Sequence, residues 1–416
     1  MSLVPSVPAS DAVAEPLGWR MILPVFVIVC TYSAGVAAVL PVLPFLVREM
    51  GGSPLVLGIV IATEAISQFA SAPVLGQLSD RFGRKQVLMA SQAIAAVSLC
   101  VLASAPSIAF ILLARGLFGM TAGNISVTAA YIADHTVPTR RRQAMGVLMG
   151  GAGLGGIIGA GLSGLLSDTS LTAPVVVALA LTLASIAVTA WRLDGGRPKT
   201  TATADAGGGG EAISFRAILG SPVIRVLIIV MTCHFFAYGM YVSQLPVFLA
   251  DTFVWNGHAF GAKELSYLIM ADGAINILVQ LFLLGWLGRH LNERNLILVI
   301  FALICTGFVT AGLATTIPVL ALAVLCVSTG DALAKPTYLA ALSVHVSPQR
   351  QGVVMGAGQA LVAAADIVSP VLGGFILGYA LYGLWIGAAV AMAIGGAVLA
   401  VAGLPGRGDP EAPPSG

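Results

Sequence analysis

Long apolar blocks alternate with short charged or Pro- and Gly-rich breaks along the chain. A helix that crosses a bilayer needs about 20 mostly apolar residues, and twelve blocks reach that length. The predicted spanning helices are residues 21–48, 54–78, 86–105, 108–133, 143–166, 171–191, 223–250, 264–288, 295–314, 317–346, 351–378 and 381–403. The pattern predicts an all-α polytopic membrane protein. Pro41 and Pro44 predict a break near the end of the first helix, because proline removes a backbone donor.

A polar, glycine-rich stretch separates the sixth block from the seventh. It includes four consecutive glycines, Gly207–Gly210, and its composition is typical of a flexible linker. The predicted units are an N-terminal six-helix bundle (1–192), a cytoplasmic linker (193–222), a C-terminal six-helix bundle (223–404) and a disordered cytoplasmic tail (405–416).

The two halves repeat one another weakly. Gly76-Gln77-Leu78 has a counterpart in Gly285-Trp286-Leu287, and Arg142-Gln143 matches Arg350-Gln351 at nearly the same offset. Two matches at one spacing favour a duplication. We therefore predict twelve transmembrane helices in two six-helix repeats.

Composition supports a membrane protein and excludes several other classes. Hydrophobic residues make up 58% and charged residues 9% of the chain, whereas a soluble domain is about a quarter charged. A net charge of +2 without a basic tract argues against nucleic acid as a partner. The five cysteines lack metal-type spacing. We find no phosphate-binding loop and no nucleophile–base arrangement, so we expect neither an enzyme nor a cofactor.

Arginine and lysine are distributed unequally between the predicted loops. Sixteen of the 20 lie on one side and only Arg48 and Lys263 on the other, while Arg115 and Lys335 are inside helices. Basic residues favour the cytoplasmic side. Both termini and the linker are therefore expected in the cytoplasm, in an inner-membrane protein.

Seven Asp, Glu, Lys, Arg or His residues lie in the interiors of the predicted spans, away from the span ends. A charge at mid-helix costs roughly 2.5–3.5 kcal/mol on insertion scales, so each needs a structural or functional reason. These candidates for proton coupling or substrate binding are Glu64, Arg115, His234, Asp272, Asp331, Lys335 and Asp366.

Each candidate also has a structural interpretation. Asp331 and Lys335 are four residues apart and could neutralise each other on one helix face, although Asp366 could instead be the partner of Lys335. His234 could be packing or part of a cation site. No metal site is assigned.

Glu64 has no charged neighbour within its own helix, and Asp272 holds nearly the equivalent place in the second half. A lone carboxyl in a low dielectric takes up a proton more readily than one in water, which suits proton coupling. The alternative for Glu64 is a permanently protonated hydrogen-bond donor near Gln68.

The segment Gly76–Lys85 is a short charged turn between two apolar blocks. It resembles the G-x-L-x-D-R-x-G-R-[RK] signature of the major facilitator superfamily, and Arg115-Gly116-Leu117-Phe118-Gly119 resembles the family's fourth-helix R-x-x-x-G motif, associated with proton coupling. Further similarity, at Ala130–Asp134 and Arg350–Gly352, is to the proton-coupled drug-efflux branch that includes tetracycline antiporters.

The resemblance implies an arrangement and a gate. Helices 1, 4, 7 and 10 would line a central cavity, and helices 2, 5, 8 and 11 would join the halves. Asp80 would cap the start of helix 11, and Arg84 would pair with Asp134. The cytoplasmic gating motif implied is Gly76, Asp80, Arg81, Gly83, Arg84 and Asp134.

Three hypotheses follow for the function. The first is a monomeric, proton-coupled carrier that exports a small organic molecule by alternating access, driven by the proton gradient and without a bound cofactor. Because carboxylates outnumber bases inside the spans, we expect that molecule to be cationic or zwitterionic. The second keeps the fold but carries a metal ion, a metal chelate or a polyamine. The third is a membrane sensor that transports nothing.

Overall fold

The computed structural model describes residues 19–121, 124–136, 138–193, 221–346 and 351–405. Within these ranges twelve helices, or pairs of consecutive helices, are long and apolar enough to cross a membrane. The predicted all-α fold is confirmed. The polar stretch at 194–220, which contains most of the predicted linker, and the tail from 406 lie outside the described residues.

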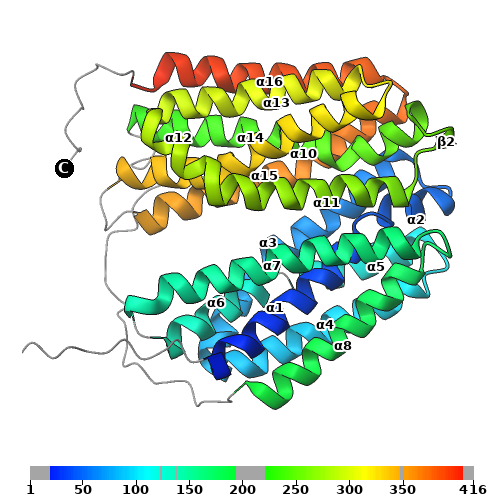
Figure 1. Cartoon of the computed structure of the whole chain (residues 1–416), viewed down its shortest axis with the longest axis vertical. Helices are drawn as coiled ribbons and strands as arrows, with labels where there is room; N and C mark the ends of the chain where they lie inside the picture. Colours follow the sequence, from blue (N-terminus) through cyan, green and yellow to red (C-terminus); the bar gives the residue numbers. More distant parts are fainter. Residues whose placement is uncertain (1–18, 122–123, 137, 194–220, 347–350, 406–416) are drawn as a thin grey trace, which may run out of the picture.

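The first six spans form one bundle (Figure 1). Their helices are α1 (Trp19–Val39), α2 (Leu43–Glu49), α3 (Pro54–Phe82), α4 (Arg84–Ala103), α5 (Ile108–Gly119), α6 (Asn124–His135), α7 (Pro138–Leu166) and α8 (Ala173–Arg192). The first span breaks between α1 and α2 at residues 40–42, where the prolines predicted it. A second break, between α5 and α6, was not predicted.

The last six spans form the second bundle. They comprise α10 (Pro222–Thr252), α11 (Ala262–Leu278), the π-helical turn η1 (Val279–Leu283), α12 (Leu284–His290), α13 (Glu293–Gly312), α14 (Ile317–Val344), α15 (Gln351–Gly378) and α16 (Tyr382–Gly403). A two-stranded antiparallel hairpin, β1 (Val254–Trp255) and β2 (His258–Ala259), follows α10. We did not predict this hairpin.

The two bundles use the same packing pattern. In the first, α1 packs on α7 and α8, and α4 packs on α8; in the second, α10 packs on α15 and α16, and α13 packs on α16. These pairs occupy equivalent places in the order of spans. The packing therefore repeats between the halves, as the weak sequence repeat indicated.

The halves meet where α3 packs on α15 and where α7 packs on α11. The first contact joins spans 2 and 11, and the second joins spans 5 and 8. This is the arrangement implied by the family resemblance. In Figure 1 the bundles approach each other near α2 and β2 and lie further apart near α6 and α12. We call the first side the Arg48 end and the second the Arg84 end.

Glycines along these four spans also indicate that the halves lie closer together at the Arg48 end than at the Arg84 end. A Cβ on Gly58 of α3 would lie 2.3 Å from the carbonyl oxygen of Pro370, and one on Gly374 of α15 would lie 2.3 Å from that of Pro54. Small residues allow this close approach of backbones. Towards the Arg84 end the positions are open, since a Cβ would meet no described atom within 4 Å at Gly76, Gly146, Gly285 or Gly356.

Candidate functional site

A cavity of about 360 Å³ lies between α3 of the first half and α10, α14 and α15 of the second. Its wall includes Gln68 and Phe69 of α3, Phe235 of α10, Lys335 of α14, and Gln359 and Asp366 of α15. The cavity therefore joins side chains from both halves. Of the seven predicted site residues, it brings together Lys335 and Asp366.

Lys335 and Asp366 come from neighbouring helices, and both line this cavity. Neither makes an ion pair within 4.0 Å or a side-chain hydrogen bond to the described residues. The alternative in which Asp331 neutralises Lys335 along one helix is wrong, because Asp331 lies against His234 instead. The ammonium of Lys335 and the carboxylate of Asp366 are exposed at the cavity.

Glu64 of α3 forms an ion pair with Arg115 of α5. Arg115 is only 3% exposed, and its guanidinium also lies 5.0 Å from the centroid of the Phe118 ring. The prediction of Glu64 as a lone carboxyl is therefore wrong. The hypothesis considered only charges within the helix that contains Glu64. The partner of Glu64 is 51 residues away, on a neighbouring helix.

His234 of α10 is fully buried, with Nε2 3.5 Å from a carboxylate oxygen of Asp331 on α14. Its ring centroid lies 5.5 Å from that of Tyr338. The imidazole thus joins α10 to α14 inside the second half. Burial leaves it no direct contact with the central cavity, which neither His234 nor Asp331 lines.

Asp272 of α11 accepts a hydrogen bond from the hydroxyl of Ser328 on α14. This bond links α11 to α14 inside the second half. No set of three or more His, Cys, Asp or Glu side chains in the described ranges could hold a metal ion.

The motif at the Arg84 end forms a compact cluster within the first half. Arg84 lies 3.1 Å from Asp134 of α6 and 2.7 Å from Asp80, and it donates a hydrogen bond to the hydroxyl of Ser79 at 3.0 Å. The pairing implied for Arg84 and Asp134 is present. Gly83 has φ +95°, a conformation that glycine adopts without strain, and it separates α3 from α4.

The other members of the motif lie at the same turn. Arg81 packs over the ring of Phe82 at 5.3 Å, and Gly76 lies one turn earlier on α3. The implied cap of helix 11 by Asp80 concerns the residues before Gln351, which lie outside the described ranges; within them, Asp80 contacts Arg84. Whether this cluster works as a gate stays a prediction.

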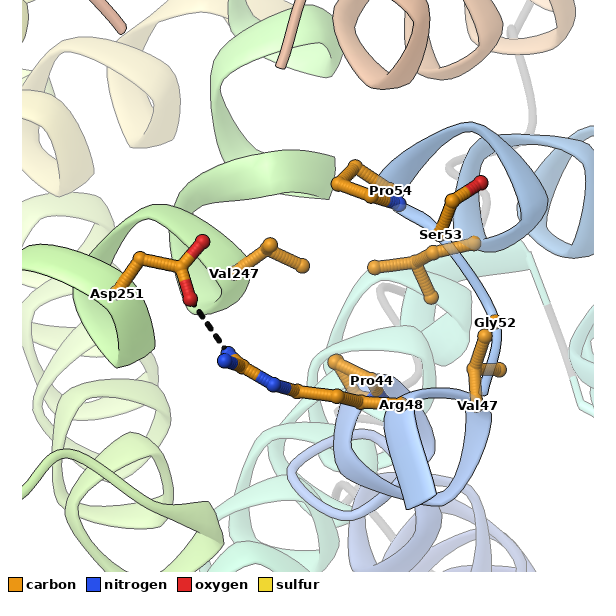
Figure 2. A pocket seen from close by; sticks show the side chains of 9 residues that line it. Pro44, Val47, Arg48, Gly52, Ser53, Pro54, Val247 and Asp251 are labelled. Atoms are coloured by element: carbon orange, nitrogen blue, oxygen red, sulfur yellow. Dashed lines mark ion pairs between the residues drawn. The ribbon is translucent and has the colours of Figure 1, made fainter. Parts of the chain in front are cut away.

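Two ion pairs join the halves at the Arg48 end. Arg48 of α2 lies 2.7 Å from Asp251 of α10 (Figure 2), and Lys263 of α11 pairs with Asp168 after α7. Tyr382 of α16 donates a hydrogen bond to Asp251 at 3.3 Å. The sequence singled out Arg48 and Lys263 by their side of the membrane but missed their acidic partners.

Gln244 adds a buried polar link beside these pairs. Its amide nitrogen, on α10, lies 3.3 Å from the carbonyl oxygen of Pro54 on α3 and 3.2 Å from that of Pro370 on α15. A backbone carbonyl oxygen has two lone pairs, so each of these carbonyls can accept the Gln244 bond in addition to a helical one. We call the two ion pairs and the Gln244 bonds the outer closure.

Reversing the charge of Arg48 is expected to loosen the outer closure partially. Arg48→Asp places a carboxylate against Asp251, whereas Arg48→Asp combined with Asp251→Arg restores an opposite-charge pair. Since exposed ion pairs are worth about 0–1 kcal/mol, the shift should be modest. Spin labels at Ser107→Cys and His258→Cys, in a background without the five native cysteines, measure the separation of the halves at this end. Equal distance distributions in the single and double variants would contradict the expectation.

Residues 25–370 match the sequence profile of the Major Facilitator Superfamily. The class G tetracycline resistance protein of Vibrio anguillarum is 31% identical over 366 residues, covering 85% of this chain and 89% of that protein. The class C protein of Escherichia coli is 29% identical over 348 residues, with 82% and 85% covered. Multidrug resistance protein 2 of Bacillus subtilis is 25% identical over 356 residues, again with 82% and 85% covered.

Solved structures support the fold. The nucleoside transporter NupG has a TM-score of 0.76 at 14% identity, covering 91% of this chain and 98% of that one. The human organic anion transporter MFSD10 has a TM-score of 0.65 at 21% identity, covering 93% and 100%. With the twelve candidate spans and the family profile, these likenesses identify the chain as a multi-pass membrane transporter that belongs to the Major Facilitator Superfamily.

Proposed function

We propose that the protein is a proton-coupled secondary transporter of the inner membrane that exports a small organic molecule by alternating access. The observation that carries the proposal is the cavity between α3, α10, α14 and α15, which presents Asp366 and Lys335 where the two halves meet. In the described residues the halves pack closely at the Arg48 end and leave more space at the Arg84 end. A carrier needs a site that each side can reach in turn, and two rocking bundles provide it. The tetracycline and multidrug resistance proteins among the relatives favour export of an organic molecule.

The positive-inside distribution favours a cytoplasmic Arg84 end, with both termini on that side. In that orientation the structure represents a state closed to the outside by the outer closure and open towards the cytoplasm. The cavity would then receive substrate from the cytoplasm, as an exporter requires. Opening the other end must break the Arg48, Lys263 and Gln244 contacts.

Asp366 and Asp272 are the carboxylates that we propose take up protons. Among the described residues, Asp366 faces the cavity without an ion pair, and Asp272 accepts a bond from a neutral hydroxyl rather than from a cation. A carboxylate that lacks a cationic partner in a low dielectric is protonated more easily than one in an ion pair. Glu64 is instead neutralised by Arg115, so its main contribution is structural.

Proton exchange is expected to accompany transport in inside-out membrane vesicles. After respiration acidifies the lumen, tetracycline serves as the first probe, and ACMA fluorescence reports the loss of the pH gradient. Asp366→Asn and Asp272→Asn should each abolish the tetracycline-dependent recovery of fluorescence, because an amide cannot take up the proton.

Glu49→Gln is the matched control, since Glu49 is an exposed carboxylate at the end of α2. It should behave as the wild type. If Asp366→Asn and Asp272→Asn both retained the full recovery, the assignment of proton coupling to these residues would fail.

A further inference from the structure

The central cavity contains one exposed ammonium and one exposed carboxylate. Lys335 comes from α14 and Asp366 from α15, and neither forms an ion pair with any residue in the described part of the chain. A charged side chain at membrane depth normally pairs with another group. Both charges are therefore available to a ligand.

None of the other charged side chains in the described spans lines this cavity. Glu64 is paired with Arg115, Asp331 lies against His234, and Asp272 is bonded to Ser328. The additional carboxylates of the spans, whose excess suggested a cationic or zwitterionic substrate, thus lie outside the lining of this cavity. The cavity itself presents equal numbers of positive and negative groups.

The wall also includes two amides and two aromatic rings. The side chains of Gln68 and Gln359 make no hydrogen bonds to other described residues, and Phe69 is 51% exposed. Gln68 and Phe69 come from the first half, whereas Gln359 and Phe235 come from the second. A ligand in the cavity would contact both halves through polar groups and through rings.

We propose that this cavity binds a zwitterion: an organic molecule with one anionic and one cationic group on an apolar, ring-bearing body. The anionic group lies at Lys335, the cationic group at Asp366, and the body packs between Phe69 and Phe235. The inference rests on the proposed transport function, since it names the substrate class of that site. A ligand with a single charge would satisfy one side chain and leave the cavity with a net charge at membrane depth.

Three dansyl compounds test the proposal because they share one fluorophore and differ in charge. Nε-dansyl-lysine is a zwitterion, dansylglycine an anion and dansylcadaverine a cation. Their dissociation constants are measured by dansyl fluorescence on the purified full-length protein in lipid nanodiscs. The wild type should bind the zwitterion about tenfold more tightly than either of the others, or better, because it alone makes charge-assisted bonds at both side chains.

Two variants assign the charges. Lys335→Met should reduce the affinity for the zwitterion to that for the cation, and Asp366→Asn should reduce it to that for the anion. The double exchange Lys335→Asp with Asp366→Lys keeps both charges and should retain the preference for the zwitterion even where a single variant folds poorly. Glu49→Gln, outside the cavity, should leave all three constants unchanged.

The proposal is overturned if the wild type binds the three compounds equally, if it binds none at millimolar concentration, or if neither single variant changes the ranking. The vesicle assay with tetracycline reads the transport function separately. If proton exchange is observed but the zwitterion is not preferred, only the inference about the substrate class is contradicted. If the preference for the zwitterion depends on Lys335 and Asp366 but no proton exchange is observed, only the proposal of proton coupling is contradicted.

Discussion

Arg115→Met is expected to destabilise the protein strongly and to abolish transport. The substitution leaves the Glu64 carboxylate without its partner inside the membrane-spanning part of the first half. Removing one member of a buried ion pair typically costs about 3–5 kcal/mol, because the remaining charge is uncompensated. Thermal unfolding of the purified protein and tetracycline-dependent proton exchange in vesicles measure the two losses.

Removing both charges separates structure from coupling. Glu64→Gln combined with Arg115→Met leaves no unpaired charge, so the double variant should recover most of the thermal stability. Arg225→Met is the matched control, since Arg225 is exposed and makes no ion pair within the described residues. A double variant as unstable as Arg115→Met would contradict the ion-pair explanation. A stable double variant that showed no proton exchange would indicate that Glu64 takes part in proton coupling.

Gly58→Ala and Gly374→Ala are expected to open the Arg48 end. Each new Cβ would lie 2.3 Å from a backbone carbonyl oxygen of the facing helix, at Pro370 and Pro54 respectively. Backbone atoms cannot move aside as a flexible side chain can, so α3 and α15 must separate. The equilibrium should shift towards the state in which the outer closure is broken.

The shift is measured by the reaction of Val247→Cys with a membrane-impermeant maleimide, in a background without the five native cysteines. Val247 lines the small cavity beside Arg48 and Asp251 (Figure 2). A destabilisation of the closed end by about 1.4 kcal/mol would raise the population of the open state, and hence the labelling rate, about tenfold. Gly378→Ala, on α15 with no neighbouring atom within 4 Å, is the control. Equal labelling rates in all variants would show that the glycine contact does not control opening.

The spans were predictable because each apolar block is long enough to cross a membrane, and Pro41 and Pro44 marked the break between α1 and α2. The hairpin had a signal that we missed. Asn256 and Gly257 have φ +47° and +88°, and Asn-Gly is the preferred pair for a two-residue turn with positive φ. The break between α5 and α6 contains no proline, so hydropathy alone passed over it.

The sequence predicted which residues to consider for the site but not which residues they contact. Each charge inside a span could be named from the cost of placing it there. The partner of Glu64 is 51 residues away, and that of Arg48 lies in the other half. Spacing along one helix therefore suggested a pair of Asp331 with Lys335 that the described residues do not form, and it suggested no partner for Glu64.

By itself, the sequence determined that the chain crosses the membrane twelve times in two similar halves, because the length of apolar blocks and the distribution of charges are local properties. It also determined which residues are too costly in a span to be accidental. Only the tertiary structure decided which of these charges neutralise each other and which face the cavity. It did so because helix packing brings together residues far apart in the chain, and within the described residues it leaves Lys335 and Asp366 without an ion pair at the cavity between the halves.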